Sequence, residues 1–315
     1  MNLQNKLQLI QRVSCIMFLT LFIPNLMAQE QAHYSLYNLY QPSINPAAMG
    51  SFDRFTAAGI FNYQMIGFNG APVNLLADVT APIGKTNLII GGQVQHDRIG
   101  VRNKTQLSLS FAYRILLNIR NYLSIGLTST LKMHETSFQN AAPLDPNDPL
   151  LANQTNQVWS PDFKIGLYYF RDNFYAGASV GNIFTTNFSN SQNNLRASIE
   201  DIHFYLHTGF QVNFNKAWKF QPSFLWKQIA GSPAQFDINT QFLFQDVWGF
   251  GLSYRTLNTL VIQTNVTVAK TLQIGYAFNM GLGFSNSTQY TGHEIMIVYR
   301  SNKYKKKIPV QVPRF

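Results

Sequence analysis

The stretch Gln106–Arg114, with the sequence QLSLSFAYR, alternates polar and apolar residues one by one. Because side chains on a β-strand point alternately to opposite sides, this pattern gives one apolar face and one polar face. Similar alternation recurs in short segments from about residue 55 to about residue 300. A closed barrel in an outer membrane requires this arrangement, with apolar side chains toward lipid and polar side chains toward the lumen. The apolar face of the quoted stretch consists of Leu107, Leu109, Phe111 and Tyr113.

Composition supports the same fold class. Of 315 residues, 46% are hydrophobic and 14% aromatic, whereas only 12% are charged. About a quarter of the residues in soluble domains are charged, so this chain is poor in charge. Beyond the N-terminus no apolar run is long enough for a membrane-spanning helix. The composition therefore favours an all-β outer-membrane barrel over a cytosolic enzyme.

The N-terminus has the pattern of an export signal. Lys6 and Arg12 form a basic region, residues 16–23 are apolar, and Ala28 offers a small residue for cleavage before Gln29. We therefore predict a signal peptide over residues 1–28. The alternative of a lipid anchor on Cys15 is disfavoured, because this cysteine precedes most of the apolar region. The mature chain would then contain no cysteine, which excludes disulfides and thiolate metal sites.

The basic character of the chain is concentrated at its C-terminus. The formal net charge is +10, and removal of Lys6 and Arg12 reduces it to +8. We interpret residues 301–315 as a solvated basic tail, with a contact to an acidic partner or to phospholipid headgroups as the alternative. No nucleic-acid-binding face is expected. The clustered basic residues are Arg300, Lys303, Lys305, Lys306, Lys307 and Arg314.

Alternation and turn residues together predict about 14 antiparallel strands in a barrel over residues 52–300. Residues 29–51 would precede the barrel as a periplasmic segment or fold inward as a partial plug. The predicted strands cover residues 52–65, 73–82, 87–97, 104–117, 122–134, 160–170, 173–184, 202–214, 218–228, 235–245, 247–257, 259–269, 271–280 and 292–300.

The connections between these strands provide a separate test. Outer-membrane barrels have short periplasmic turns and longer extracellular loops. If the first strand runs outward, every second connection is a tight turn, and the opposite set contains the three longest connections. This phase agrees with a membrane barrel, whereas a soluble sandwich, which also alternates, would not require it. The long connections are residues 135–159, 185–201 and 281–291.

The alternation also assigns a lipid-facing side to individual strands. Between residues 203 and 214 the apolar set is led by Phe204, Leu206 and Phe210, opposite His203, Tyr205 and His207. Aromatic residues near strand ends are expected to form the interfacial girdles of the barrel. The expected girdle residues are Tyr122, Trp159, Trp218, Trp226, Trp248 and Tyr299.

Three stretches are more specific than the alternation. Residues 45–50 read NPAAMG, residues 64–72 read QMIGFNGAP, and residues 292–297 read GHEIMI. They resemble the entry, the first hairpin and the closing strand of the PorP/SprF family of outer-membrane proteins, associated with the type IX secretion system of Bacteroidetes. The resemblance extends over essentially the whole mature chain. It departs at Asn62 and Met65, where the family usually has Arg and Trp, so an Arg–aromatic contact is not expected here.

Glycine and proline in these motifs permit tight backbone turns, so we interpret the motif residues as structural, with direct contact to a partner as the alternative. Gly292 to Ile297 would close the barrel, and His293 and Glu294 lie within that element. The residues assigned this role are Asn45, Pro46, Ala47, Gly50, Gln64, Gly67, Gly70, Ala71, Pro72, His293 and Glu294.

A search for catalytic or metal-binding residues finds no convincing constellation. His203 and His207 share a strand face but lie about 13 Å apart along it, too far to share a metal. Asp145 and Asp148 fall in a proline-rich stretch that could bind calcium weakly, although a rigid outer loop is the simpler reading. No Gly-x-Ser-x-Gly element or nucleotide-binding fingerprint is present, so we expect neither an enzyme nor a cofactor. The ionisable residues expected to pair inside the lumen are Asp78, Lys132, Lys164, Asp237 and Glu294.

The resemblance implies a non-enzymatic barrel that supports export or surface anchoring of cargo with a C-terminal sorting domain, such as gliding adhesins. Its partners would be that cargo domain, periplasmic and outer-membrane components of the secretion machinery, and outer-membrane lipid. The long outer loops would meet cargo, and Lys303 to Lys307 would make an inner contact. The alternative function is a channel for a small or hydrophobic solute, since a barrel of about 14 strands is wide enough to need a plug or to leave a channel. A barrel hydrolase is a third, weaker alternative.

Overall fold

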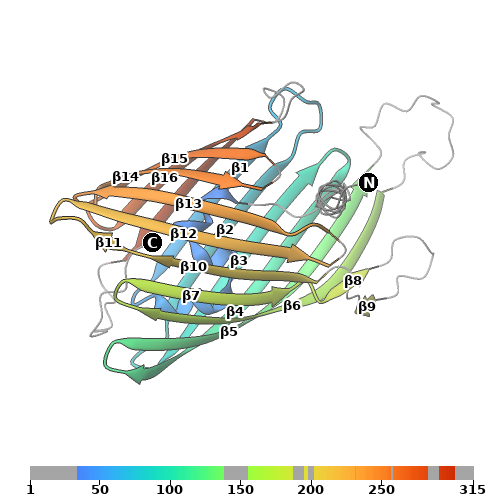
Figure 1. Cartoon of the computed structure of the whole chain (residues 1–315). Coiled ribbons are helices and arrows are strands. Elements are labelled where there is room, and N and C mark those ends of the chain that lie inside the picture. The colour runs from blue at the N-terminus through green and yellow to red at the C-terminus, as the bar shows by residue number, and fades with distance from the viewer. Residues whose placement is uncertain are drawn as a thin grey trace, which may run out of the picture.

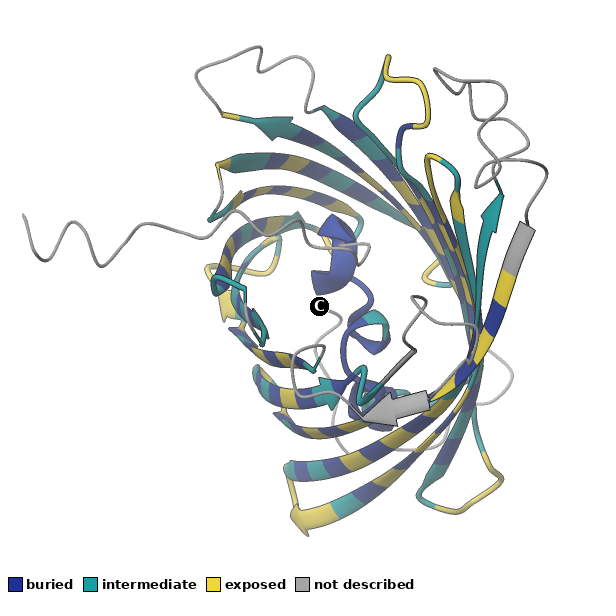
Figure 2. Cartoon of the chain, turned by 90° about the vertical axis from the view of Figure 1, so that its right-hand side faces the viewer, coloured by how far each residue is buried: buried dark blue, intermediate teal, exposed yellow. Residues whose placement is uncertain are grey.

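The structure, a computed structural model, describes residues 34–137, 155–186, 195–197, 202–230, 232–256, 258–282 and 291–301. They form a closed antiparallel β-barrel with three short 3₁₀ helices inside it (Figures 1 and 2). The wall has 14 strands when β10 and β11 are taken as one strand interrupted at Gln211, which confirms the predicted number. Within the described residues, no helix has the length and apolar character needed to cross a membrane.

The wall strands follow one another around the barrel in chain order. They are β1 (Thr56–Gln64), β2 (Val73–Pro82), β3 (Leu88–Ile99), β4 (Arg102–Asn118), β5 (Asn121–Ser137), β6 (Thr155–Arg171), β7 (Phe174–Gly181), β10 (His203–Phe210), β11 (Val212–Asn213), β12 (Trp218–Ile229), β13 (Gln235–Phe244), β14 (Trp248–Arg255), β15 (Thr259–Val268), β16 (Leu272–Gly281) and β17 (Gly292–Arg300).

The barrel is closed by its first and last strands. β1 pairs antiparallel with β17, from Thr56 opposite Arg300 to Gln64 opposite Gly292. Across the far side, β10 pairs with both β7 and β12. Every wall strand has two neighbours, so the sheet closes on itself, although residues 155–164 at the outer end of β6 pair with β5 and not with β7. A separate hairpin of β8 (Phe184–Thr186) and β9 (Leu195–Ala197) lies between β7 and β10 in the chain.

The expected phase of short and long connections is present. All links at one end, which we call the inner end, are short, and they include residues 119–120 and 172–173. The opposite, outer end carries the links at residues 138–154, 182–202 and 282–291, which lie largely outside the described residues. The six short inner links alternate with the outer links along the chain, as predicted.

Four predicted strand boundaries are wrong by three residues or more. The first strand begins at Thr56 and not at residue 52, because residues 52–55 lead from the interior to the wall. β5 continues outward to Ser137 and β6 begins already at Thr155, and Thr136 pairs with Asn156. The loop predicted at residues 135–159 is therefore shorter. β7 ends at Gly181, after which the chain enters the β8–β9 hairpin. Polar ladders outside the bilayer need no alternation, which explains why the sequence pattern missed these extensions.

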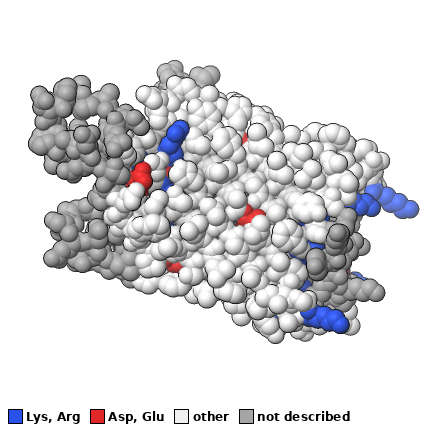
Figure 3. Space-filling view, turned by 180° about the vertical axis from the view of Figure 1, so that it is seen from behind, with Lys and Arg blue, Asp and Glu red and all other residues white. Residues whose placement is uncertain are grey.

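The outer surface is apolar, as the alternation predicted. On β10, Phe204, Leu206 and Phe210 are exposed, and the alternate residues His203, Tyr205 and His207 are buried. Striped strands in Figure 2 reflect this alternation around the ring. Seen from behind, Lys and Arg lie toward both ends of the barrel, and between them the surface is mostly uncharged with small patches of Asp or Glu (Figure 3).

Of the six residues predicted for the girdle, four are exposed, Trp226 is half-buried, and Tyr122 contradicts the prediction. Trp159, Trp218, Trp248 and Tyr299 are exposed near strand ends. Tyr122 is buried at 4% exposure, because it has the same orientation on β5 as Ser124 and points into the lumen.

The three short helices fill part of the lumen (Figure 2). They are η1 (Ser35–Asn38), η2 (Gln41–Ser43) and η3 (Pro46–Ser51). Nearly all residues from Tyr34 to Gly50 are buried. We call residues 34–51 the plug.

Candidate functional site

The plug runs along the lumen from the outer half of the barrel toward its inner end. Ser35 bonds to Asn279, two residues from the outer end of β16. Gly50 bonds to Arg114, four residues from the inner end of β4. The plug therefore begins in the outer half of the lumen, runs toward the inner end, and is followed by the first wall strand at Thr56. Its contacts with the wall are the best-defined polar arrangement in the molecule.

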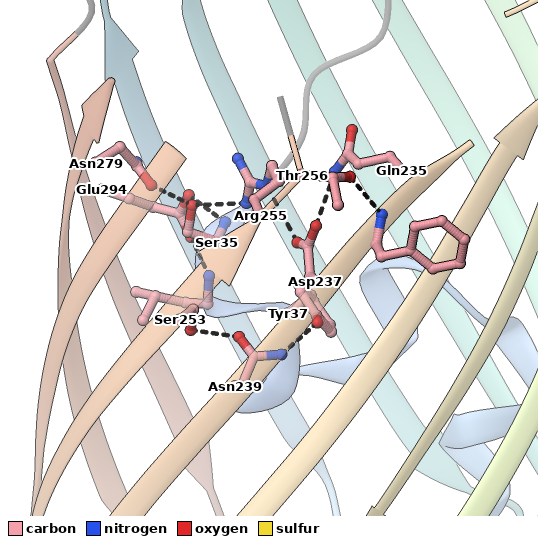
Figure 4. A network of polar contacts seen from close by, with 12 residues as sticks. Ser35, Tyr37, Gln235, Asp237, Asn239, Ser253, Arg255, Thr256, Asn279 and Glu294 are labelled. Carbon is pink, nitrogen blue, oxygen red and sulfur yellow. Dashed lines mark hydrogen bonds and ion pairs between the residues drawn. The ribbon is translucent and has the colours of Figure 1, made fainter. Parts of the chain in front are cut away.

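Glu294 holds the outer end of the plug. Its two carboxylate oxygens accept hydrogen bonds from the backbone N–H groups of Ser35 and Leu36, both at 2.8 Å (Figure 4). These N–H groups open a 3₁₀ helix, where backbone donors lack partners within the helix. The fully buried Glu294 supplies the negative charge and the acceptors that this helix start requires. The closing motif of the chain thus binds its entry segment.

A network of polar side chains extends this attachment to β13 and β14. Arg255 donates to Asp237 at 3.1 Å and to the Ser35 hydroxyl at 3.2 Å. Asn239 donates to the Tyr37 hydroxyl at 2.5 Å (Figure 4). Because Asp237 is 2% exposed on its side chain, its pairing with Arg255 offsets the cost of burying both charges.

Asn45 is the central anchor of the plug. Its side-chain Nδ2 lies 2.9 Å from the carbonyl oxygen of Leu167, 3.3 Å from that of Ala178 and 3.1 Å from His207 Nε2. Its Oδ1 accepts from the backbone N–H of Ala47 and caps η3. Pro46 occupies the first helical position, where a missing N–H costs nothing. Asn45 is fully buried, so one side chain joins the plug to β6, β7 and β10.

Glycines on three neighbouring strands make room for this anchor. A Cβ atom on Gly166 would lie 2.0 Å from Asn45 Oδ1, and one on Gly126 would lie 2.3 Å from Ala47 N. A Cβ on Gly177 would lie 2.8 Å from Asn45 Nδ2. We call Gly126, Gly166 and Gly177 the glycine cradle. The cradle lets the plug backbone approach the wall more closely than any other residue would permit.

The inner end of the plug is held by Arg114. Its Nε donates to the carbonyl oxygen of Gly50 and its Nη2 donates to that of Phe52 at 2.7 Å. A Cβ on Gly50 would lie 2.0 Å from Ser124 Oγ, so this motif glycine is required by close packing against β5. A buried guanidinium with two carbonyl acceptors fixes the point where the plug turns into β1.

Two tyrosines add hydrogen bonds between the plug and the wall. Tyr40 donates its hydroxyl to Asp78 on β2, and Tyr168 on β6 donates to Gln41 at 2.5 Å. Burial raises the pKa of Tyr40 well above its ordinary value, and the carboxyl group of Asp78 raises it further. The Tyr40 hydroxyl therefore keeps its proton and remains a donor.

An inward aromatic cluster, which the sequence analysis missed, packs against the same part of the plug. The rings of Tyr122 and Phe170 stack with centroids 5.2 Å apart, and Tyr168 stacks on His207 at 5.7 Å. Each of these residues alternates with lipid-facing neighbours, so strand parity was the signal that identified them as inward. The cluster consists of Tyr122, Tyr168, Phe170, Tyr175 and His207, with Ala47 and Ala48 of the plug packed among its rings.

The hairpin motif lies apart from the plug, in the outer link between β1 and β2. Gly67 and Gly70 have φ values of 96° and 76°, which only glycine adopts readily. Gly70 accepts a hydrogen bond from the N–H of Gly100 at 2.9 Å, which ties this link to the β3–β4 turn. Gln64 ends β1 and its N–H donates to Pro72, next to Ala71.

The remaining predicted residues divide into two groups. His293 faces outward on β17, where its ring lies 2.6 Å from the Tyr276 hydroxyl, so it does not share the role of its neighbour Glu294. Lys303, Lys305, Lys306 and Lys307, together with Asp145, Asp148 and the signal region 1–28, lie outside the described residues. Among the residues that are described, no cluster of three or more His, Cys, Asp or Glu could hold a metal.

Comparison with solved structures gives several barrels similar in fold. The CymD monoaromatic hydrocarbon channel has 9% sequence identity and a TM-score of 0.51, over 88% of this chain and 96% of that chain. The Ralstonia pickettii toluene transporter TbuX has 11% identity and a TM-score of 0.49, over 82% and 92%. A Pseudomonas aeruginosa FadL homologue has 10% identity and a TM-score of 0.46, over 81% and 92%. At these identities the first likeness concerns the fold alone, and the other two are weaker.

A search of curated proteins found no match. The family model for the type IX secretion system membrane protein PorP/SprF, in contrast, matches residues 26–299, which include the plug, the cradle and Glu294. A membrane barrel of this family fits the outer membrane and an association with components of the secretion machinery. The chain belongs to the PorP/SprF family of type IX secretion system membrane proteins.

Proposed function

We propose that this barrel acts in type IX secretion as a plugged, non-enzymatic support that retains or helps export cargo carrying a C-terminal sorting domain. The observation that supports this proposal is the plug, which is bonded to strands around the ring from β2 and β4 through β6 and β7 to β13, β14, β16 and β17. A conducting channel needs an open path through its lumen, where this barrel holds the plug. A support needs a rigid wall, and the hydrogen bonds of the plug join strands around the wall.

A cellular experiment tests the role in secretion. The gene would be deleted and then restored, and the surface, medium and cell-associated proteins of the strains would be quantified by mass spectrometry. We expect proteins with sorting domains to leave the surface fraction on deletion and to return on restoration. An unchanged surface fraction in the deletion strain would contradict the proposal.

The main alternative is transport of a small or hydrophobic solute. The likeness in fold to a hydrocarbon channel is the reason to test it. Planar-bilayer recording of the purified barrel separates the two functions. We expect little ion conductance from the native chain and clear conductance after deletion of residues 34–51. Substantial conductance from the native chain would favour transport over support.

A further inference from the structure

A polar cavity lies beside the plug in the lumen. It is bounded on one side by Tyr34, Ser43 and Ile44 of the plug, and on the other by inward side chains of β2 to β7 and β10. The wall residues that matter here are Gln106, Lys132, Asp162, Lys164 and His203. None of the hydrogen bonds described above that hold the plug involves these five residues.

Asp78, Lys132, Asp162 and Lys164 line this cavity, and two further lysines near His203 give this part of the lumen an excess of positive charge. Lys104, Lys132, Lys164 and Lys227 all lie close enough to His203 to act on it electrostatically. Lys132 pairs with Asp162 at 2.8 Å, and the ammonium group of Lys164 lies 5.8 Å from the centroid of the Tyr205 ring. Over the described parts of the chain, no ion pair joins Lys104, Lys164 or Lys227 to a carboxylate.

Gln106 gives an independent indication of a ligand. Its side chain is among the buried polar groups, at 7% exposure, and its Nε2 has no hydrogen-bond partner in the structure. Gln106 lies directly across from Lys132 in the β4–β5 ladder. A buried donor without a partner is costly, and an acceptor placed beside Lys132 would satisfy it. Both features call for the same kind of group, an oxyanion.

We propose that the lumen binds a ligand with several carboxylates, held by Lys132 and Lys164 and by the amide of Gln106. The four lysines come from four strands, β4, β5, β6 and β12, so a ligand with spaced carboxylates can reach several of them. The carboxylates belong either to an acidic peptide segment or to a free organic anion. This site is additional to the proposed role in secretion, and its test needs no cargo.

The test uses the full mature chain in nanodiscs and a fluorescent tetraglutamate peptide as the probe, with tetraglutamine as the uncharged control peptide. We expect binding of tetraglutamate only, weakened by salt. Lys164→Gln should weaken it about tenfold, the size of one charge-assisted hydrogen bond. Lys219→Gln is the matched control, because Lys219 pairs with Asp246 at the inner end and lies far from the cavity.

Competition with citrate then separates the two sources of carboxylate. Displacement of the probe by citrate indicates that a free anion suffices, and no displacement indicates that the peptide is recognised; either result retains the carboxylate site. Because Lys164→Gln could impair folding, heat-modifiable migration in gels is checked, and Gln106→Ala, which removes the amide without a partner, provides a second variant. The proposal is overturned if native protein does not bind tetraglutamate, or if folded Lys164→Gln and Gln106→Ala bind it as tightly as native protein.

Discussion

The two main attachments of the plug differ in their chemistry. The outer attachment uses charge, since Glu294 accepts from two backbone N–H groups and Arg255 donates to Ser35. The central attachment is neutral, since the Asn45 amide fits among the glycines of the cradle. The outer attachment requires the carboxylate side chain of Glu294. The central attachment requires that the three cradle positions carry no side chain. Loss of fit and loss of charge should therefore affect the barrel differently.

The largest expected effect comes from filling the cradle. Gly126→Ala places a Cβ atom against the backbone of Ala47, which cannot rotate away, so we expect a loss of about 3 kcal/mol in the free energy of unfolding. The plug should also leave its position and ion conductance should appear. Urea unfolding in micelles and planar-bilayer recording measure the two effects.

The control for this substitution is Gly92→Ala on the outer face. A Cβ there would meet only Val79 Cγ2, at 3.9 Å. It should unfold like the native chain. Equal unfolding curves for the two variants would mean that the cradle does not fix the plug.

Removal of the charge at the outer attachment should have a smaller effect. Glu294→Gln keeps one acceptor but turns an NH₂ group toward the N–H of Ser35 or Leu36, so we expect a loss of about 2 kcal/mol. Limited proteolysis should cut the plug near Ser35 faster than in the native chain. His293→Gln, on the outward face next to it, should leave the cleavage rate unchanged. Identical cleavage of Glu294→Gln and native protein would remove Glu294 as the anchor of this end.

The smallest expected effect concerns a single hydroxyl group. Tyr40→Phe removes the donor to Asp78, and we expect it to cost about 1 kcal/mol in the free energy of unfolding. Tyr34→Phe is the matched variant, because the buried Tyr34 hydroxyl has no hydrogen-bond partner in the structure. Its removal should cost nothing. If both variants lose the same stability, the Tyr40–Asp78 bond contributes nothing specific.

Strand parity carried more information than the sequence analysis used. Once Leu123, Ile125 and Leu127 are assigned to lipid, Tyr122 must point into the lumen, yet its position near a strand end suggested a girdle. The extended ends of β5 and β6 had no such signal. Beyond the membrane both faces of a strand meet water, so the apolar alternation stops while backbone pairing continues.

Alternation along the chain determined the 14-strand barrel, its lipid-facing side and its inner and outer ends, because each depends on residues that are neighbours in sequence. The motif stretches indicated the family. Only the tertiary structure decided where the plug lies and what holds it. The hydrogen bond from Ser35 to Glu294 joins residues 259 positions apart in the sequence, and the contact between Asn45 and His207 joins residues 162 positions apart. Contacts of this kind join segments that are far apart in sequence, so no local pattern encodes them.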